Sequence, residues 1–263
     1  MLLLACGPYI GSIESEILLF RPFVYWLQLV LKPNITVVSS HYNREFLYEN
    51  CSFFPVYEDL TRNEFGQIGA THSYIPVKDY NLILKKFKNH IQDTFRVQKD
   101  FIYYYNLSYV KNPWIPLYKR YFTKINIIPN KKNQILFIPN NTEKIDVIHN
   151  VYNSLVSRYN NIVCCGDMKT YLPEYNILLK DSTYFQNVYI NMINLITDAK
   201  MVITPVSHWS VMADLQGTPS FTWGSGSYPM LSNKSKFINI KNIPVSSLTN
   251  MIEQFIGEKN ANI

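Results

Sequence analysis

The sequence has little glycine and little cysteine: 9 glycines and 4 cysteines occur among its 263 residues. Cys6, Cys51, Cys164 and Cys165 show no CxxC or CxxxC spacing, so we interpret them as free thiols of a reducing compartment and not as a disulfide framework. The histidines have no metal-ligand spacing with each other or with cysteine. We therefore predict no metal site and no cofactor. A redox Rossmann enzyme is disfavoured because no GxGxxG motif follows the first apolar run.

Long hydrophobic runs are also missing. The first apolar run, Leu2–Cys6, has no basic region before it and is too short for a signal peptide. The next run, Ile17–Leu31, is interrupted by Arg21 and Pro22 and is shorter than the roughly 20 residues that a membrane-spanning helix needs. We therefore expect no transmembrane segment and predict a cytoplasmic location.

The sequence does contain an excess of basic residues and enough apolar residues for a core. Lys and Arg outnumber Asp and Glu and give a formal net charge of +6. That charge favours phosphorylated or otherwise anionic partners, but the dense basic blocks of a dedicated nucleic-acid binder are absent. With 47% hydrophobic residues, the chain can bury the core of one large or two small α/β domains.

Short apolar runs alternate with helical patterns in two stretches, separated by a candidate linker at Asn126–Asn133. The expected strands are Leu2–Cys6, Asn34–Ser40, Phe53–Tyr57, Gln134–Ile138, Asn161–Cys165, Met201–Thr204 and Ser220–Trp223. The expected helices are a run ending at Leu31, His41–Asn50, Leu82–Phe95, Glu143–Tyr159, Tyr184–Thr197, Ser207–Leu215 and Ser246–Glu258. This alternation predicts two Rossmann-like α/β domains with parallel sheets, at 1–127 and 133–245, and a C-terminal helix at 246–263 that crosses back.

The most informative segment is 199–224. An apolar strand there runs into a turn broken by proline, a short helix begins near Ser207 and ends at Gly217, and a new strand follows. The helix N-terminus is thus aimed at the carboxyl edge of the sheet. Its N–H groups and positive dipole end can hold a diphosphate, and the hydroxyls of Ser207 and Ser210 can add donors. The alternative is an ordinary strand–helix–strand unit with Ser207 as N-cap.

This segment resembles the donor-binding segment of the heptosyltransferase-like, family 9 glycosyltransferases of the GT-B fold. The features that match in order and spacing are Ser207, Ala213, Gly217, Pro219 and the strand that leads to Gly224. Other positions differ. The helix histidine of the family pattern falls at Val211, whereas the imidazole here is at His208, and Val206 stands where an Asp is common.

The resemblance implies a GT-B fold, in which two parallel-sheet domains face a cleft. It also implies metal-independent transfer of a sugar from a nucleotide diphosphate donor to a hydroxyl acceptor such as a glycan. The donor site then lies in the second domain, with Ser207, His208, Ser210 and Gly217 as donor contacts.

The start of the chain supplies a second, weaker match, because its glycines and a Glu before an apolar helix resemble the opening of related bacterial and phage-encoded proteins. We place Gly7 and Gly11 on the acceptor side, since glycines after a first strand let a substrate approach the backbone. His41 can line the same side or be structural. Glu16 or Glu14 is the candidate base for the acceptor hydroxyl. The alternative is that both glutamates only complement the dipole of the helix that they open.

Turns after two strands of the second half supply further donor-side candidates. Pro139 and Asn140 follow the first of these strands, where such enzymes often bind phosphate. Gly166, Asp167 and Lys169 follow the next one, where a lysine can pair with phosphate and an aspartate with a ribose or base. A solvated turn explains this last segment equally well.

Two other functions stay open. A DNA-base glycosyltransferase of the same fold would hold the duplex with the basic and aromatic stretch from Lys85 to Phe101 and extrude a base. An amphipathic helix with a solvated basic face explains that stretch as well. The second alternative is a non-catalytic nucleotide- or sugar-binding module, which the displaced helix histidine and the short chain favour.

Overall fold

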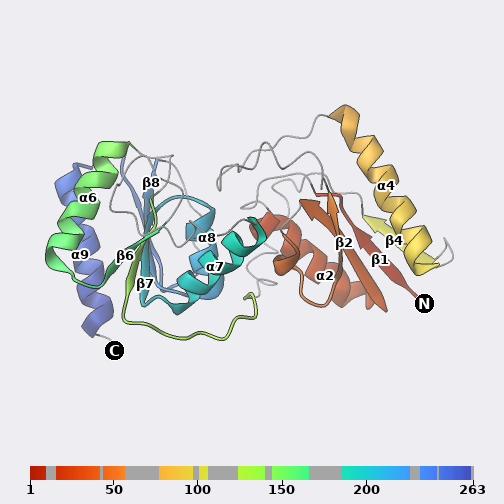
Figure 1. The fold of residues 1–263 in the computed structure, drawn as a ribbon, viewed down its shortest axis with the longest axis horizontal. Coiled ribbons are helices and arrows are strands. Elements are labelled where there is room, and N and C mark those ends of the chain that lie inside the picture. The colour runs from red at the N-terminus through yellow and green to blue at the C-terminus, as the bar shows by residue number, and fades with distance from the viewer. Residues whose placement is uncertain are drawn as a thin grey trace. The chain divides into compact units, whose positions relative to one another are not determined.

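A computed structural model describes residues 1–9, 16–41, 44–56, 77–96, 101–105, 124–139, 144–165, 185–225, 232–241 and 243–261 (Figure 1). The chain divides into two compact units, Met1–Ile125 (unit 1) and Asn126–Ile263 (unit 2). Each unit is built on one parallel sheet. In the described part of the chain, no helix is long and apolar enough to cross a membrane.

Unit 1 has a four-stranded sheet in the order β3-β2-β1-β4, and every neighbouring pair of strands is parallel. The strands are β1 (Leu3–Cys6), β2 (Ile35–His41), β3 (Ser52–Val56) and β4 (Ile102–Tyr105). The helical elements are the π-helical turn η1 (Glu16–Phe20), α2 (Arg21–Leu31), the 3-10 turn η2 (Glu45–Leu47) and α4 (Val77–Phe95). Because all four strands run the same way, the loops after β1 and β2 leave the sheet at one edge, its carboxyl edge.

The apolar spacing of the unit 1 helices decides which faces are buried. Helix α4 places Phe87 and Ile91 against Leu3, Ala5 and Val37 of the sheet. The solvent face of the same helix carries the exposed lysines of the basic stretch. This agrees with an amphipathic helix whose basic face is solvated.

Unit 2 has a five-stranded sheet in the order β6-β5-β7-β8-β9, again parallel throughout. The strands are β5 (Ile135–Phe137), β6 (Ile162–Cys164), β7 (Met201–Pro205), β8 (Ser220–Gly224) and β9 (Lys236–Asn239). The helices are α6 (Ile145–Arg158), α7 (Phe185–Asp198), α8 (His208–Gln216) and α9 (Val245–Ala261). The order places β5 and β7 side by side at the centre, so the turns that follow them meet at one edge.

The last helix belongs to the core of unit 2. In Figure 1, α9 lies beside α6, and its side chains Leu248, Ile252 and Phe255 are buried together with Phe137 and Phe221 of the sheet. The apolar stripe of α9 thus packs on the sheet of its own unit, and the crossing back of this helix to the first domain stays a prediction.

The predicted class of two parallel α/β units is confirmed, and the structure corrects some of its elements. The predicted helix over His41–Asn50 is wrong: His41 ends β2, and among the described residues of this stretch only Glu45–Leu47 form a helical turn. So short a segment cannot offset the cost of helix nucleation by itself. Strands β4 and β9 were not predicted.

Candidate functional site

The turn between β7 and α8 is built on a capping box. Ser207 is the N-cap of α8, and its Oγ accepts a hydrogen bond of 3.2 Å from the backbone N–H of Trp209. Ser210, in the first helical turn, forms the reciprocal hydrogen bonds. Its Oγ accepts from the N–H of Ser207 at 3.1 Å and donates to the carbonyl of Ser207 at 2.6 Å. The Ser-x-x-Ser spacing is the local reason that the helix begins here.

This capping box decides which groups remain for a ligand. The N–H groups of Ser207 and Trp209 are paired inside the turn, and so is the hydroxyl hydrogen of Ser210. These groups are therefore already used within the turn, and Ser207 is the N-cap that the alternative interpretation describes. The Ser207 hydroxyl acts as an acceptor and keeps its own hydrogen for donation. His208 begins α8, but its side chain lies outside the described residues.

Pro139 lies at the same edge of the sheet as Ser207. The N–H of Ile138 donates to the carbonyl of Ile203 at 2.9 Å, and Thr204 Oγ1 donates to the carbonyl of Ile138 at 2.7 Å. These bonds hold the ends of β5 and β7 together, directly before Pro139 and the Ser207 turn. The other candidates predicted nearby, Asn140, Gly166, Asp167 and Lys169, lie outside the described residues.

Gly217 lies at the other end of α8. It adopts a left-handed conformation with φ of 69°, and its N–H bonds to the carbonyls of Ala213 and Asp214 as the helix ends. A nine-residue helix is about 13 Å long, so Gly217 and the Ser207 turn are well separated. Gly217 is thus the C-cap of α8, and its predicted contact with a donor stays a prediction.

Gly7 follows β1 at the carboxyl edge of unit 1. Its φ is 111°, and a Cβ on it would lie 2.3 Å from the carbonyl oxygen of Ser39 in β2. A glycine is therefore needed here because a neighbouring strand approaches closely, and the predicted approach of a substrate on the acceptor side stays a prediction. Gly11 and Glu14 lie outside the described residues, and His41 ends β2 with a side chain that is also outside them.

Glu16 opens η1 and is completely buried. Its Oε1 accepts a hydrogen bond of 2.6 Å from the phenol of Tyr48, and its Oε2 forms an ion pair with Nη1 of Arg44. Arg44 and Tyr48 are the residues that flank η2 on either side. The carboxylate is therefore held by a cation and a phenol from the loop that follows β2, and not by the helix dipole alone.

The electrostatics of this cluster keep Tyr48 protonated. Burial raises the pKa of Tyr48 well above its ordinary value of 10.0, and the negative charge of Glu16 raises it further. The phenol thus acts as a hydrogen-bond donor to the carboxylate at every ordinary pH. Arg44 and Tyr48 were missed from the sequence because a distance of about thirty positions from Glu16 leaves no periodic signal.

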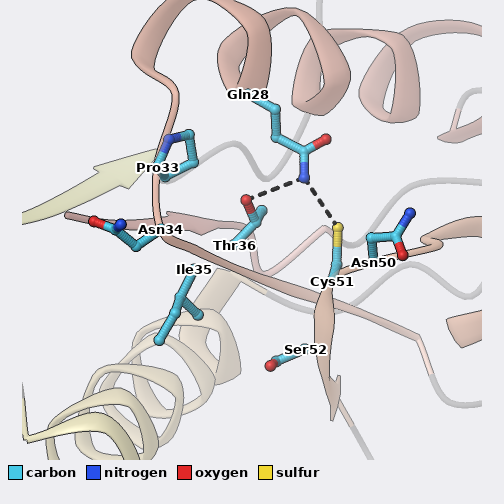
Figure 2. A pocket seen from close by; sticks show the side chains of 8 residues that line it. All are labelled: Gln28, Pro33, Asn34, Ile35, Thr36, Asn50, Cys51 and Ser52. Carbon is cyan, nitrogen blue, oxygen red and sulfur yellow. Dashed lines mark hydrogen bonds between the residues drawn. The ribbon is translucent and has the colours of Figure 1, made fainter. Parts of the chain in front are cut away.

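A pocket of about 420 Å³ lies at the opposite, amino edge of the unit 1 sheet (Figure 2). Its lining is uncharged: Gln28, Pro33, Asn34, Ile35, Thr36, Asn50, Cys51 and Ser52. As Figure 2 shows, the Gln28 amide donates to Thr36 Oγ1 at 3.0 Å and to Cys51 Sγ at 3.4 Å. Burial raises the pKa of the Cys51 thiol to about 11, so it is not a ready nucleophile.

The basic stretch of unit 1 is partly used within the unit. The ammonium of Lys88 lies 5.6 Å from the centroid of the Tyr104 ring, a cation–π contact between α4 and β4. Lys85 and Lys86 are exposed on the same helix. Lys99, which belongs to the same predicted stretch, lies outside the described residues.

Comparisons with known proteins place the fold. No family model matches the chain, and no curated protein matches it by sequence. The E. coli heptosyltransferase WaaC with ADP is 12% identical with a TM-score of 0.58, over 98% of this chain and 100% of that chain. The E. coli ADP-heptose lps heptosyltransferase II is also 12% identical with a TM-score of 0.58, over 99% of this chain and 100% of that one.

A third similar structure is the family 9 glycosyl transferase from Veillonella parvula, which is 10% identical with a TM-score of 0.58 over 97% of both chains. At this identity the similarity shows the fold. The chain has the heptosyltransferase-like GT-B fold that the segment 199–224 predicted.

Proposed function

We propose that the protein is a glycosyltransferase that moves a sugar from a nucleotide diphosphate donor to a hydroxyl acceptor, with a glycan as the acceptor class. The observation that carries the proposal is the similarity of fold across the whole chain to glycosyltransferases. Among these, WaaC has been seen with ADP and with ADP-2-deoxy-2-fluoro heptose. We therefore assign an adenosine diphosphate sugar as the first donor to test.

The proposed donor site is the carboxyl edge of unit 2. The positive dipole end of α8 and the Ser207 hydroxyl would stabilise the diphosphate as negative charge develops on it. Pro139 lies at this edge, and His208, Asn140, Gly166, Asp167 and Lys169 complete the proposed contacts. This arrangement assigns stabilisation of the leaving group to the protein itself, without a metal ion.

The proposed base is Glu16, with Glu14 as the alternative. A carboxylate has about four acceptor positions, and the bonds from Arg44 and Tyr48 use only some of them. Glu16 can therefore accept one more proton-bearing group, the acceptor hydroxyl, once the substrate reaches it.

A second candidate function is a non-catalytic nucleotide- or sugar-binding module. The observation that favours it is the complete burial of Glu16 beside a cation, which is also the arrangement of a purely structural ion pair. In that case the donor binds, and no sugar is transferred to any acceptor.

The test begins with a thermal-shift screen of the chain against adenosine, uridine, guanosine and cytidine diphosphate sugars. A ligand that binds only the folded state at 100 times its Kd stabilises it by about 2.7 kcal/mol. Ser207→Trp should abolish the shift because the indole would fill the α8 turn. Ser157→Trp, on the exposed end of α6, is the matched control and should keep it.

Transfer is then measured as release of nucleoside diphosphate from the best donor, with a panel of monosaccharide and oligosaccharide acceptors. Acceptor-dependent release that Glu16→Gln lowers by about 10²- to 10⁴-fold supports the enzyme. Donor binding without release by the wild-type chain supports the binding module. Absence of any shift contradicts both candidates.

A further inference from the structure

The helix that begins with η1 and the turn η2 are joined by buried polar contacts at more than one point. Glu16, in the first position of η1, bonds to Arg44 and Tyr48. Five residues further along the same helical run, Arg21 Nε donates to the carbonyl of Leu47 at 2.6 Å. Arg44 and Arg21 are both buried, with 4% and 1% of their surfaces exposed. Such groups are retained only where every charge has a partner.

The Tyr48 ring is fixed by its aromatic neighbours. Its centroid lies 6.0 Å from that of Phe53, in a stacked arrangement, and 6.2 Å from that of Phe20, edge to face. Phe20 in turn stacks on Tyr9 at 4.7 Å. A phenol held on both sides of its ring has little freedom, so the direction from which it approaches Oε1 of Glu16 is set by packing.

Arg21 fixes the backbone that carries the two partners of Glu16. Leu47 lies in η2 between Arg44 and Tyr48, and its carbonyl receives the Arg21 bond. The guanidinium of Arg21 also lies 5.0 Å from the centroid of Tyr25, one turn further along α2. The turn is therefore anchored independently of Glu16, and its two donors are already in place before the carboxylate meets a substrate.

We propose that Tyr48 and Arg44 are positioning residues that hold the Glu16 carboxylate in a fixed orientation for proton removal from the acceptor. The proposal rests on the proposed function. In the transfer step, the acceptor oxygen forms a bond to the anomeric carbon while its proton passes to Glu16. The bond from the anomeric carbon to the diphosphate oxygen breaks, and its electron pair leaves with the nucleoside diphosphate.

The two donors contact different oxygens of the carboxylate and act on it in different ways. Arg44 supplies a cation that pairs with Oε2 of the buried carboxylate and holds that oxygen in place. Tyr48 fills one acceptor position of Oε1 and so fixes the rotation of the carboxylate plane, which leaves the remaining lone pairs in defined directions. Misplacement of a reacting group by about 1 Å can cost about 100-fold in rate. Loss of either donor should therefore lower kcat and leave donor binding, which we assign to unit 2, unchanged.

The experiment is a double-mutant cycle on kcat with the donor and acceptor found in the transfer screen. Tyr48→Phe keeps the stacked ring and removes only the hydroxyl, and we expect it to lower kcat by about 10- to 100-fold with an unchanged KM for the donor. In a Glu16→Gln background, the same change should have no further effect, because the group that it positions is gone. A merely structural role would make the two effects multiply.

Tyr25→Phe is the matched control. Its hydroxyl is partly buried beside the same turn and bonds with Arg21 and Leu47 but not with Glu16, so kcat should change less than 3-fold (about 0.6 kcal/mol at RT of about 0.59 kcal/mol). Arg44→Lys, which keeps a cation, should retain more kcat than Arg44→Met, which has none. This pair tests the proposal by a second route, with each variant assayed below its own melting temperature because Arg44→Met also loses stability.

The outcomes separate the two proposals. Wild-type transfer with multiplicative losses at Glu16 and Tyr48, or with no loss at Tyr48, overturns the positioning role and leaves the proposed function standing. Wild-type donor binding without transfer to any acceptor overturns the proposed enzyme, and the positioning role falls with it.

Discussion

A Cβ atom on Gly7 would lie 2.3 Å from the carbonyl oxygen of Ser39, so the two backbones are as close as a glycine permits. The N–H of Gly7 is also used, in a bond of 2.9 Å to the carbonyl of Tyr105. The loop after β1 is thus pinned to β2 on one side and to β4 on the other, directly before the segment that leads to Glu16.

This contact predicts that Gly7→Ala destabilises the protein. The left-handed φ of 111° costs a non-glycine residue about 1–3 kcal/mol, and the contact with Ser39 adds strain to that. Gly257→Ala is the matched control: nothing lies within 4 Å of a Cβ there, and the residue is inside α9. That change should stabilise the helix by about 0.5–1 kcal/mol. Urea unfolding of both variants checks the opposite signs, and equal effects would contradict the prediction.

The Glu16–Arg44 pair should matter far more for stability than the surface pair Arg158–Glu253. Removal of one partner of a buried pair costs about 3–5 kcal/mol, because the other charge stays buried. Arg158 is 58% exposed, so Arg158→Met should cost less than about 1 kcal/mol. We expect Arg44→Met to lower the free energy of unfolding by the larger amount. The Arg44→Met/Glu16→Leu double variant should recover most of the loss. Failure of the double variant to recover would show that the cost is not that of a stranded charge.

The alternation of apolar runs and helical patterns was enough to predict two parallel α/β units. The elements that the sequence did not indicate have physical reasons. Strand β4 (Ile102–Tyr105) lies in an aromatic-rich stretch without clean alternation, and β9 (Lys236–Asn239) is short and only half-buried. Parallel edge strands of this kind are defined by their neighbours, β1 and β8, and not by their own pattern.

The candidate site was predictable only where its chemistry is local. The Ser207 cap can be predicted from neighbouring residues, because Ser-x-x-Ser at the start of an apolar helix is itself a capping signal. The contacts of Arg44 and Tyr48 with Glu16 are not local in sequence. They depend on a parallel sheet that brings the loops after β1 and β2 to one edge. Arg44 and Tyr48 carry no signature until that topology is known.

The partly buried thiol of Cys51 predicts a loss of stability at alkaline pH. Burial raises the pKa of Cys51 from 9.0 to about 11 in the folded chain, and the unfolded chain keeps the lower value. The stability contributed by the neutral thiol is complete below pH 9 and is lost as the pH rises from 9 towards 11. Urea unfolding at pH 8 and pH 10.5 should therefore show a smaller difference between wild type and Cys51→Ala at the higher pH. A constant difference would show that Cys51 titrates alike in both states.

Ser207 has two roles that substitutions can separate, since it caps α8 and is proposed to face the donor diphosphate. Asp and Asn are N-caps about as good as Ser, so Ser207→Asp and Ser207→Asn should change the free energy of unfolding by less than about 0.5 kcal/mol, whereas Ser207→Ala should cost about 1 kcal/mol. Donor binding should follow a different order. The Asp carboxylate repels a diphosphate, so Ser207→Asp should abolish the thermal shift, and Ser207→Asn should keep part of it.

The comparison of Asp with Asn carries the prediction because both side chains satisfy the Trp209 N–H and differ mainly in charge. Equal donor shifts for the two variants would show that the diphosphate does not lie at this turn, even if the protein binds a nucleotide sugar. Loss of the shift in Ser207→Asp alone, at unchanged unfolding free energy, would place the anionic part of the donor at the N-terminus of α8, where the helix dipole favours it.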